Sequence, residues 1–561
     1  MLNRSAKYCI FTFLVMLAAA ILLGHYKTIS YAPVSLKTPQ YQYRIVLLPL
    51  DSRPPCTQFV HQLAEIAGIE VISPPAELLD HYKTPADKQQ LLNWLYQQSE
   101  HADAAIISID MLTHGSLLAS RLSQGTPADS QNALDMLNVI HQHNPAIKLY
   151  AFNIIPRLLL ADSKENEMFK KNMLTYSVLK DQFRTFENPA DLQKLTELEK
   201  QLPPAMIDHY RTMYAQNNAV NEKLADLVET GILSGLVIGQ DDGQPFGLPN
   251  VNKQKLQRYL ANKPSIADKV QITRGTDEVA LTLLGQIAMK HASSSPRIFV
   301  AYSDEDAPRI VMPFMPHSVG TTVQEKIQIL GGTIVSQPDE ADFILYVHIG
   351  TQKNSKNKPF EVQQVQSFIQ QGYNVALVDL AENFYASETL LPELMQANAD
   401  ITKLSAYAGW NTTSNSVGTA VTQAALFTAS VRNEQDIQEL LQTYHSNLVF
   451  LTGRLLDDWF FEKDIQPYVN KRLKWLRIDP YNLGPHYQYV DTIIKKLMSN
   501  RGDQLLKNHL ENHPLQLNSS QGSYSIVITS LKVKTLLPWE RTFEILVKPS
   551  IDLGYADQAA D

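Results

Sequence analysis

Short apolar runs alternate with helical patterns along most of the chain. Six runs rich in β-branched residues occupy residues 44–50, 69–73, 104–110, 148–155, 235–242 and 269–273, and five more occupy residues 297–304, 333–336, 342–350, 374–380 and 403–409. Runs that are apolar throughout and separated by helices are typical of parallel strands buried on both faces. The pattern therefore predicts an α/β protein built largely on parallel sheets.

The same pattern predicts the domain organisation. The first series forms an N-terminal α/β domain over 41–292, either barrel-like or doubly wound, and the Ser/Pro break at 293–296 ends it. The second series forms a flavodoxin-like α/β domain over 296–430. Residues 431–515 read as a helical segment, and alternation over 523–549 predicts antiparallel strands in a small C-terminal β segment, 516–561. The polar stretch 161–230 predicts helices that break at Pro203 and Pro204.

The N-terminus carries a targeting pattern. Residues 9–24 contain no charged side chain and follow Arg4 and Lys7. This is typical of a signal peptide or, without cleavage, of an N-terminal membrane anchor, here residues 1–32. We expect the remaining chain to be exported, periplasmic or extracellular, and to meet the membrane only through this segment. Cys56 would be its one cysteine, so an internal disulfide is excluded.

Composition narrows the function class. Hydrophobic residues make up 44% and charged residues 19%, as in ordinary globular proteins. The net charge is −8 without a long basic run, which argues against a nucleic-acid partner. No P-loop, GxGxxG turn after a strand, HExxH, paired CxxC or GxSxG motif is present, so we expect no nucleotide cofactor and no structural zinc. The oligomeric state stays open.

Chemically versatile side chains follow most of the predicted strands. Because ligands in parallel α/β folds bind beyond the carboxyl ends of the strands, these side chains are the candidate site. Asp241 and Asp242 are the candidate catalytic pair. The candidate substrate-binding residues are Asp51, Arg53, Asp110, Arg121, Asn153, Arg157, Asp277, Trp410, Asn411 and Asn415.

Glycoside hydrolysis is the chemistry that this set favours. It needs two carboxyl groups in different environments, one protonated and one ionised. The neighbours Asp241 and Asp242 can divide these roles, because like charges raise the pKa of one member of a pair. Arg53 and Arg121 would bind hydroxyls or a carboxylate, and Trp410 would stack on a sugar ring. The substrate would be a small molecule or a glycan.

Two other functions remain open at this point. Asp51, Asp110, Asp241 and Asp242 could together hold Mg²⁺, Mn²⁺ or Ca²⁺, in a metal-dependent hydrolase or isomerase. The two α/β parts could also form a glycan- or solute-binding protein without turnover.

Several long motifs resemble those of a bacterial family described only as a domain of unknown function. They are LLPLDSRPP, SIDMLTHGSLLASR, VIGQDDGQPFG, RGTDEVA, YAGWNTTSNSVGTA, RLLDDWFF and LPWERTFEI. The resemblance spans nearly all of the exported part and implies one unit rather than loosely joined domains, but it implies no activity. The chain departs from the expected pattern at residues 114–116 and at Cys56, which weakens a catalytic role for His114 and a redox role for Cys56.

Overall fold

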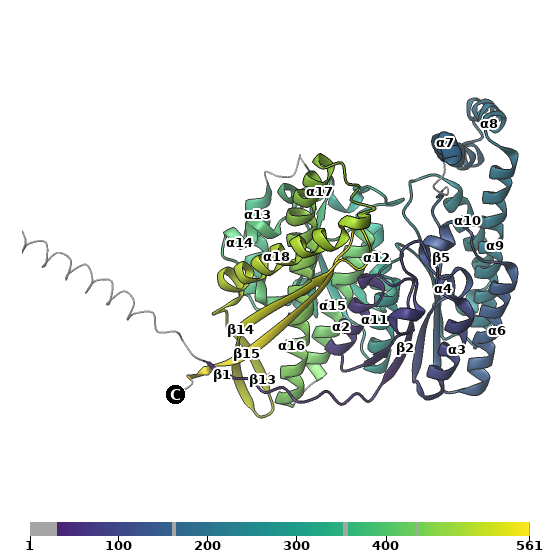
Figure 1. The fold of residues 1–561 in the computed structure, drawn as a ribbon. Coiled ribbons are helices and arrows are strands. Elements are labelled where there is room, and N and C mark those ends of the chain that lie inside the picture. Colours follow the sequence, from purple (N-terminus) through teal and green to yellow (C-terminus); the bar gives the residue numbers. More distant parts are fainter. Residues whose placement is uncertain (1–30, 160–163, 352–356, 434–435, 560–561) are drawn as a thin grey trace, which may run out of the picture.

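The computed structural model describes residues 31–559 apart from 160–163, 352–356 and 434–435. Two parallel sheets and one antiparallel sheet organise these residues, with helices covering the parallel sheets (Figure 1). The fold is therefore α/β with largely parallel sheets, as the hydrophobic pattern predicts. The predicted signal or anchor lies almost wholly in residues 1–30, outside the described residues.

The first sheet has six parallel strands in the order β3-β2-β4-β5-β6-β7. They are β2 (Arg44–Leu48), β3 (Glu70–Ile72), β4 (Ala104–Ser108), β5 (Lys148–Ile155), β6 (Gly235–Gln240) and β7 (Val270–Arg274). Numbered along the chain, this order is 2-1-3-4-5-6, which extends the flavodoxin-like order of an open doubly wound sheet. The barrel-like alternative is wrong, because β3 and β7 are edges that do not pair with each other among the described strands.

Helices cover both faces of the first sheet. The face toward the second sheet carries α2 (Gln58–Ile66) and α11 (Val279–His291). The opposite face carries α3 (Lys88–Gln98), α6 (Pro127–His143), α9 (Pro204–Glu229) and α10 (Leu248–Ala261). Two short helices, α4 (Ile109–His114) and α5 (Leu117–Arg121), follow β4. The Ser108 hydroxyl accepts a hydrogen bond from the Met111 amide and starts α4, so β4 ends two residues earlier than the apolar run predicts.

The second sheet has five parallel strands in the order β12-β11-β10-β8-β9. They are β8 (Arg297–Tyr302), β9 (Thr333–Val335), β10 (Phe343–Gly350), β11 (Val375–Ala381) and β12 (Leu404–Ala408). This is again the flavodoxin-like order, as predicted. Helices α12 (Val319–Leu330) and α15 (Thr413–Asn433) face the first sheet, whereas α13 (Lys358–Gln370) and α14 (Leu391–Gln396) cover the other face.

One apolar core joins the two sheets. It contains Phe152 of the first sheet and Ile298 of the second, with Leu284 and Val421 from the helices between them, and each is fully buried. A charged contact crosses the same junction, since Lys326 Nζ donates to Glu278 Oε1 at 2.6 Å with both side chains fully buried. The two α/β parts therefore pack as one body.

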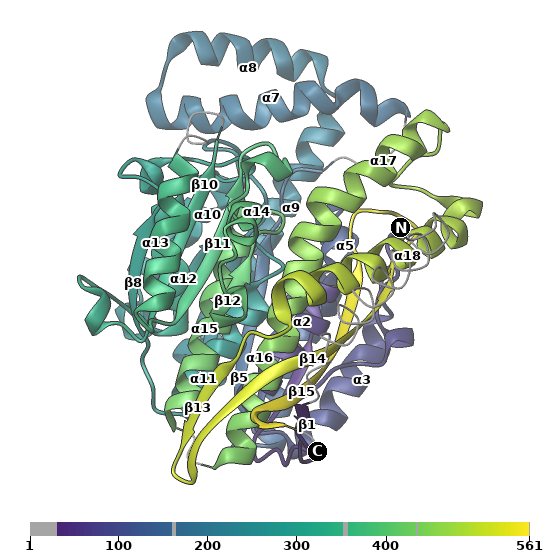
Figure 2. The ribbon, with the colours of Figure 1, turned by 90° about the vertical axis from the view of Figure 1, so that its left-hand side faces the viewer.

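The C-terminal part wraps the outer face of the second sheet. Its helices are α16 (Ile437–Arg454), α17 (Gln466–Trp475) and α18 (Tyr487–Leu505), with π-helical segments at Leu455–Ile465 and Leu506–Leu510. An antiparallel sheet in the order β1-β15-β14-β13 completes it, formed by β1 (Tyr31–Pro33), β13 (Leu515–Ser519), β14 (Gly522–Leu536) and β15 (Leu546–Ala559). Figure 2 shows the long β14 and β15 crossing in front of α16 and α2.

The polar stretch before α9 forms a helical hairpin at one end of the molecule. Its helices are α7 (Lys164–Phe186) and α8 (Pro189–Gln201), which lie side by side beyond the sheets (Figure 2). The predicted break at Pro203 and Pro204 separates α8 from α9. Glu187, with φ of 53°, and the capping Asn188 add a break that the sequence pattern did not indicate. None of the described helices is both long and apolar enough to cross a bilayer.

Candidate functional site

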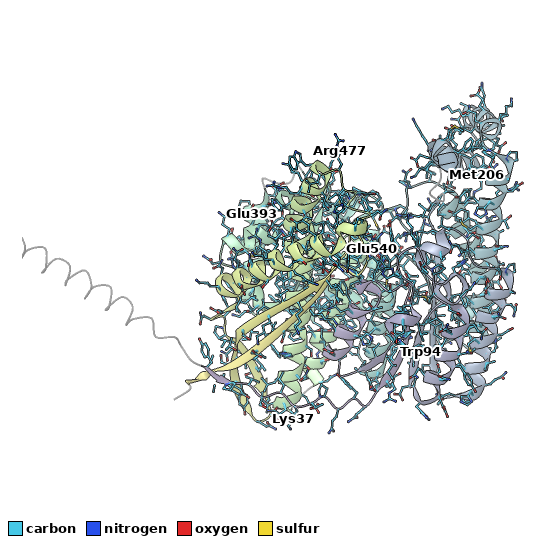
Figure 3. The ribbon with its side chains drawn as sticks, in the orientation of Figure 1. Lys37, Trp94, Met206, Glu393, Arg477 and Glu540 are labelled. Atoms are coloured by element: carbon cyan, nitrogen blue, oxygen red, sulfur yellow. The ribbon has the colours of Figure 1, made fainter. Side chains whose placement is uncertain are left out.

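A cleft of about 540 Å³ opens beyond the carboxyl ends of the strands of the first sheet. Eight of the predicted site residues line it: Asp51, Arg53, Arg121, Arg157, Asp242, Asp277, Trp410 and Asn411. The second sheet and the C-terminal part supply further walls with Phe314, Phe384, Asp457, Glu462, Lys463, Gln466, Tyr481, Trp539, Arg541, Phe543, Glu544 and Ile545. Figure 3 labels Glu540, from the segment joining β14 to β15, near the middle of the view, and the adjacent Trp539 contacts Ser52 of the first α/β part.

Arg53 joins two carboxylates in the cleft wall. Its Nη2 donates to Asp51 Oδ2 at 2.6 Å and to Asp277 Oδ1 at 2.7 Å. Asp51 follows β2 and Asp277 follows β7, so one guanidinium connects distant strand ends. Burial alone would raise the pKa of Asp51, but the charge and hydrogen bonds of Arg53 lower it below its ordinary value. Asp51 is therefore held ionised.

Among the described residues, one group has the side chains and spacing that a metal ion needs. Ligand atoms of Asp51, Cys56 and Asp277 lie within 4.8 Å of one another. Burial, together with the charges of the two aspartates, raises the pKa of the Cys56 thiol well above its ordinary value, so it stays protonated. Because Arg53 already supplies a positive charge between the two carboxylates, the group fits a buried ion-pair network better than a metal site.

Asp241 and Asp242, directly after β6, pair with different arginines. Arg121 Nε and Nη2 donate to the two oxygens of Asp241 at 2.6 and 2.7 Å. Arg157 Nη1 donates to Asp242 Oδ2 at 2.7 Å. The Asp241 side chain is 1% exposed, whereas that of Asp242 is 30% exposed and faces the cleft. The first aspartate is locked behind the wall and the second is accessible.

The two neighbours also differ in protonation. Burial alone would raise the pKa of Asp241, but the charge and hydrogen bonds of Arg121 lower it. Burial and then the charge of Asp241 raise the pKa of Asp242 to about 6. One carboxyl group is therefore ionised while its neighbour exchanges a proton close to neutral pH.

A stack of aromatic and cationic side chains, formed by Tyr82 of the first α/β part and by the C-terminal part, closes one side of the cleft. The rings of Tyr82 and Trp539 stack with centroids 5.4 Å apart. The Arg541 guanidinium carbon lies 4.6 Å from each ring centroid, and its Nε and Nη2 donate to both oxygens of Glu544 at 2.7 and 2.6 Å. Trp539 Nε1 also donates to Ser52 Oγ at 3.2 Å, next to Asp51. Residues far apart in sequence thus hold this wall in place.

The π-helical segment Leu455–Ile465 supplies a second charged wall. Arg454 Nη2 donates to Asp457 Oδ2 at 2.9 Å, and Arg454 Nη1 donates to Asp458 Oδ1 at 2.5 Å. Burial raises the pKa of Asp457 to about 6. Asp458 Oδ2 accepts the Gly409 amide at 2.8 Å, which ties this segment to the end of β12. π-Helical turns often occur at functional sites because they redirect side chains.

Residues after β12 contribute less to the cleft than the sequence suggests. Trp410 is 5% exposed, packs edge-on against Phe59, and donates through Nε1 to Thr419 Oγ1 at 3.2 Å. Asn411 lines the cleft with a φ of 50°. Asn415 lies behind it and donates through Nδ2 to Glu278 Oε2 at 3.1 Å. The broad ring face expected of Trp410 is turned into the core.

Asp110 and Asn153 do not reach the cleft. They line a smaller pocket of about 150 Å³ on the other side of α5. Asp110 still lies near the acidic pair, because the charge of Asp241 contributes to the rise of its pKa to about 7, after the larger effect of burial. The structure thus divides the predicted site residues between two cavities and the wall between them.

Five further residues line the cleft although their positions in the sequence predicted no role for them: Tyr82, Lys463, Trp539, Arg541 and Glu544. A signal was present for most of them. LPWERTFEI contains Trp539, Arg541 and Glu544, and it places charged residues inside an apolar run, which is unusual for a segment that only fills a core.

The chain matches a protein-family model over residues 45–548, and the family is described as "Protein of unknown function (DUF4127)". The chain belongs to this family. The matched range begins in β2 and ends in β15, so it includes all the residues named above as lining the cleft. A search of curated proteins gave no match.

The DUF4127 match treats both parallel sheets and the C-terminal part as one unit. This agrees with the single core between the sheets and with a cleft that needs residues from all three parts.

Proposed function

We propose that the protein is an exported carbohydrate-active enzyme, a glycoside hydrolase that binds its substrate in the cleft and uses Asp242 as the general acid. One observation carries the proposal: adjacent aspartates have opposite pKa shifts, and only Asp242 of the two lines the cleft. Export rests on the uncharged segment 9–24.

Asp242 suits the role of a proton donor. A pKa of about 6 keeps a substantial protonated fraction near neutral pH. In the proposed reaction its proton passes to the glycosidic oxygen as the bond from that oxygen to the anomeric carbon breaks. Asp241 does not touch the substrate, because Arg121 holds it behind the wall. It acts as a positioning residue whose charge helps Asp242 to retain its proton.

The ionised carboxylate that the reaction also needs is supplied next to Arg53. Asp51 and Asp277 share that guanidinium and line the same cleft as Asp242. The lowered pKa of Asp51 keeps one negative charge in place near neutral pH. Such a carboxylate stabilises the positive charge that develops on the sugar ring, or activates the water that adds to it.

The cleft walls fit a carbohydrate. Its volume, about 540 Å³, is in the ordinary range for small-ligand sites. Four aromatic rings along it are partly open to solvent: Phe314, Phe384, Tyr481 and Phe543, at 55%, 36%, 57% and 41% exposure. Rings with one accessible face are suited to stack on sugars.

The proposal is tested with purified full-length protein and a mixed panel of peptidoglycan fragments, chitin oligosaccharides, xylan, β-glucans and α-glucans. We expect product release from at least one glycan, reduced about 100-fold or more by Asp242→Asn, as for loss of a general acid. Asp208→Asn is the matched control, because that side chain is 72% exposed on α9, outside the cleft.

Three outcomes contradict the proposal. Glycan binding without product would indicate a binding protein. Activity that EDTA abolishes and a divalent metal restores would indicate metal-dependent chemistry. Equal turnover in Asp242→Asn would remove Asp242 from the reaction.

A further inference from the structure

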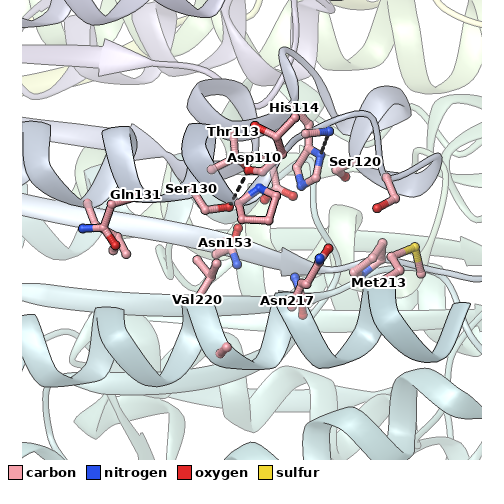
Figure 4. Close-up of a pocket in the computed structure, with 18 of the residues that line it drawn as sticks. Asp110, Thr113, His114, Ser120, Ser130, Gln131, Asn153, Met213, Asn217 and Val220 are labelled. Atoms are coloured by element: carbon pink, nitrogen blue, oxygen red, sulfur yellow. Dashed lines mark hydrogen bonds between the residues drawn. The ribbon is translucent and has the colours of Figure 1, made fainter. Parts of the chain in front are cut away.

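A second pocket, of about 150 Å³, lies between α4, α5 and α6 on one side and the long helix α9 on the other. None of the described residues lines both this pocket and the cleft. Helix α5 forms the partition, since Ser120 faces the pocket and the next residue, Arg121, lines the cleft. Figure 4 shows Asp110, Thr113 and His114 across the pocket from Asn217 and Val220.

The inner wall is polar although it is almost closed to solvent. Asp110 is 1% exposed, Ser120 2% and Asn153 3%. Asp110 Oδ2 accepts the Ile154 amide at 2.8 Å, and Asn153 Nδ2 donates to Asn221 Oδ1 at 2.7 Å. These bonds fix both side chains before any ligand arrives, which is how pre-organised polar sites are built. The same bonds offset the cost of burying these polar groups.

His114, which also lines the pocket, carries a hydrogen-bond donor on its imidazole ring. Its Nδ1 accepts the Gly125 amide at 2.8 Å. Burial, with the charge of Lys88, lowers the pKa of His114 to about 4, so the ring is neutral and its proton lies on Nε2.

The remaining lining is apolar or uncharged. Leu134, Pro156, Met213 and Val220 supply apolar surface. Among the described lining residues, Asp110 is the one carboxyl group and Lys223 the one lysine or arginine, and Lys223 Nζ donates to Gln131 Oε1 at 3.2 Å. A pocket lined by one carboxyl group, one lysine and otherwise uncharged side chains suits a neutral ligand better than an ion. A cavity of about 150 Å³ holds one six-membered ring.

We propose that this pocket binds a neutral, polyhydroxylated ring of the size of one monosaccharide, separately from the cleft. Asp110 accepts hydrogen bonds from ring hydroxyls, the Asn153 oxygen accepts another, and the apolar side chains contact the ring carbons. The site does not depend on the function proposed for the cleft, because it requires binding alone. The ring comes either from a free sugar or from the end of a longer glycan.

The test is equilibrium binding to the full-length protein, measured by calorimetry with glucose, galactose, N-acetylglucosamine and myo-inositol at millimolar concentrations. Glucuronate, glucosamine and cyclohexanol serve as charged and apolar rings of similar size. Disaccharides of the sugar that binds distinguish a free ring from a chain end. We expect a neutral polyol to bind more tightly than the charged and apolar rings.

Two variants in the pocket and one control variant in the cleft locate the binding. Ser130→Phe places a bulky ring at the pocket wall on α6 and should abolish binding. Asp110→Asn keeps the shape and the acceptor for the Ile154 amide, and should weaken binding about tenfold, as expected for the loss of one hydrogen bond to a ring hydroxyl. Arg157→Gln changes only the cleft and should leave this affinity unaltered.

The proposal is overturned if none of the polyols binds, which would leave a water-filled cavity. It is also overturned if Arg157→Gln removes binding while Ser130→Phe retains it, since the ring would then bind in the cleft.

Discussion

The two parallel sheets share a strand order, but their carboxyl edges are built differently. At the edge of the first sheet, Asp51, Arg157, Asp242 and Asp277 line an open cleft. At the edge of the second, His348, Glu361 and Asp379 are fully buried. His348 donates through Nδ1 to Glu361 Oε2 at 2.7 Å, and the Asp379 oxygens accept the amides of Leu390 and Leu391 at 2.7 and 3.0 Å.

The difference shows that strand order alone does not make a site. Both edges concentrate charged side chains, as parallel sheets do. In the second sheet the following loops fold back and satisfy these charges with backbone groups, so the network stabilises the fold. In the first sheet the charges pair mainly with arginines, which leaves Asp242 partly exposed to solvent. Whether a sheet edge forms a site therefore depends on the loops after its strands, which either cover the charged side chains or leave them accessible.

The largest expected effect comes from removing the guanidinium of Arg53, which joins Asp51 and Asp277 at the carboxyl edge of the first sheet. Arg53→Met leaves Asp51 and Asp277 buried and close together without a cation. We expect the free energy of unfolding to fall by about 3–5 kcal/mol, as for other broken buried ion pairs, and glycan turnover to be lost. Urea unfolding and the glycan assay measure the two effects.

Asp379→Asn is the matched change at the second edge. It should lower stability, because the carboxylate accepts two backbone amides, but leave the kinetics of glycan turnover unchanged. If Asp379→Asn altered the kinetics as strongly as Arg53→Met, the two edges would not differ in function.

A second prediction concerns Asp80, whose Oδ1 accepts a hydrogen bond from the Ser52 amide at 2.8 Å beside the cleft. Burial and then the charge of Asp51 raise the pKa of Asp80 to about 8. Between roughly pH 4 and this value the unfolded carboxyl ionises while the folded one stays protonated, so stability is lost as pH rises.

Asp80→Asn should remove this loss and stabilise the protein at the alkaline end by a few kcal/mol, at about 1.36 kcal/mol per pKa unit. Urea unfolding on both sides of the interval measures it. An unchanged pH dependence in the variant would show that Asp80 is ionised in the folded protein.

Much of the fold could be predicted because its signals are local. All eleven runs predicted as parallel strands are strands, since apolar residues on both faces mark a buried strand without reference to its neighbours. The choice between a barrel and an open sheet could not be made, because it depends on which edges pair. The capping of α4 by Ser108 also shows how one hydroxyl moves a predicted strand end.

The site could be predicted only in part. Asp51, Asp242 and Asp277 come together because strand ends of one sheet meet at one edge. Asp110 turns into another pocket because α4 begins immediately after β4. Trp539 meets Ser52 across 487 positions, and no local pattern encodes a contact at that separation. Contacts between residues that lie far apart in the chain could therefore not be predicted from the sequence.

The third prediction tests whether Asp242 is the group whose protonation sets the pH dependence of turnover. The positive charge of Arg157 lowers the pKa of Asp242, whereas burial and the charge of Asp241 raise it to about 6. A general acid loses activity as pH rises through its pKa. Turnover should therefore fall on the alkaline side of about pH 6.

Arg157→Gln should shift that alkaline limb to higher pH, because a charge that favours the carboxylate is removed. The control is Arg211→Gln, at a side chain 68% exposed and outside the cleft. A shift to lower pH would show that the limb reports another group.

The smallest expected effect tests the wall that the C-terminal part adds to the first edge. Arg541 lies 4.6 Å from the centroids of both stacked rings, Tyr82 and Trp539, and donates to Glu544 through two nitrogens. Arg541→Lys keeps the charge but loses the planar stack and the paired bonds, so KM should rise about tenfold or less with kcat unchanged. Arg472→Lys is the control, since Arg472 lies 5.5 Å from the Tyr468 ring on α17 and outside the cleft. A fall in kcat at constant KM would instead place Arg541 in the chemical step, and the first sheet would no longer supply all of the reacting groups.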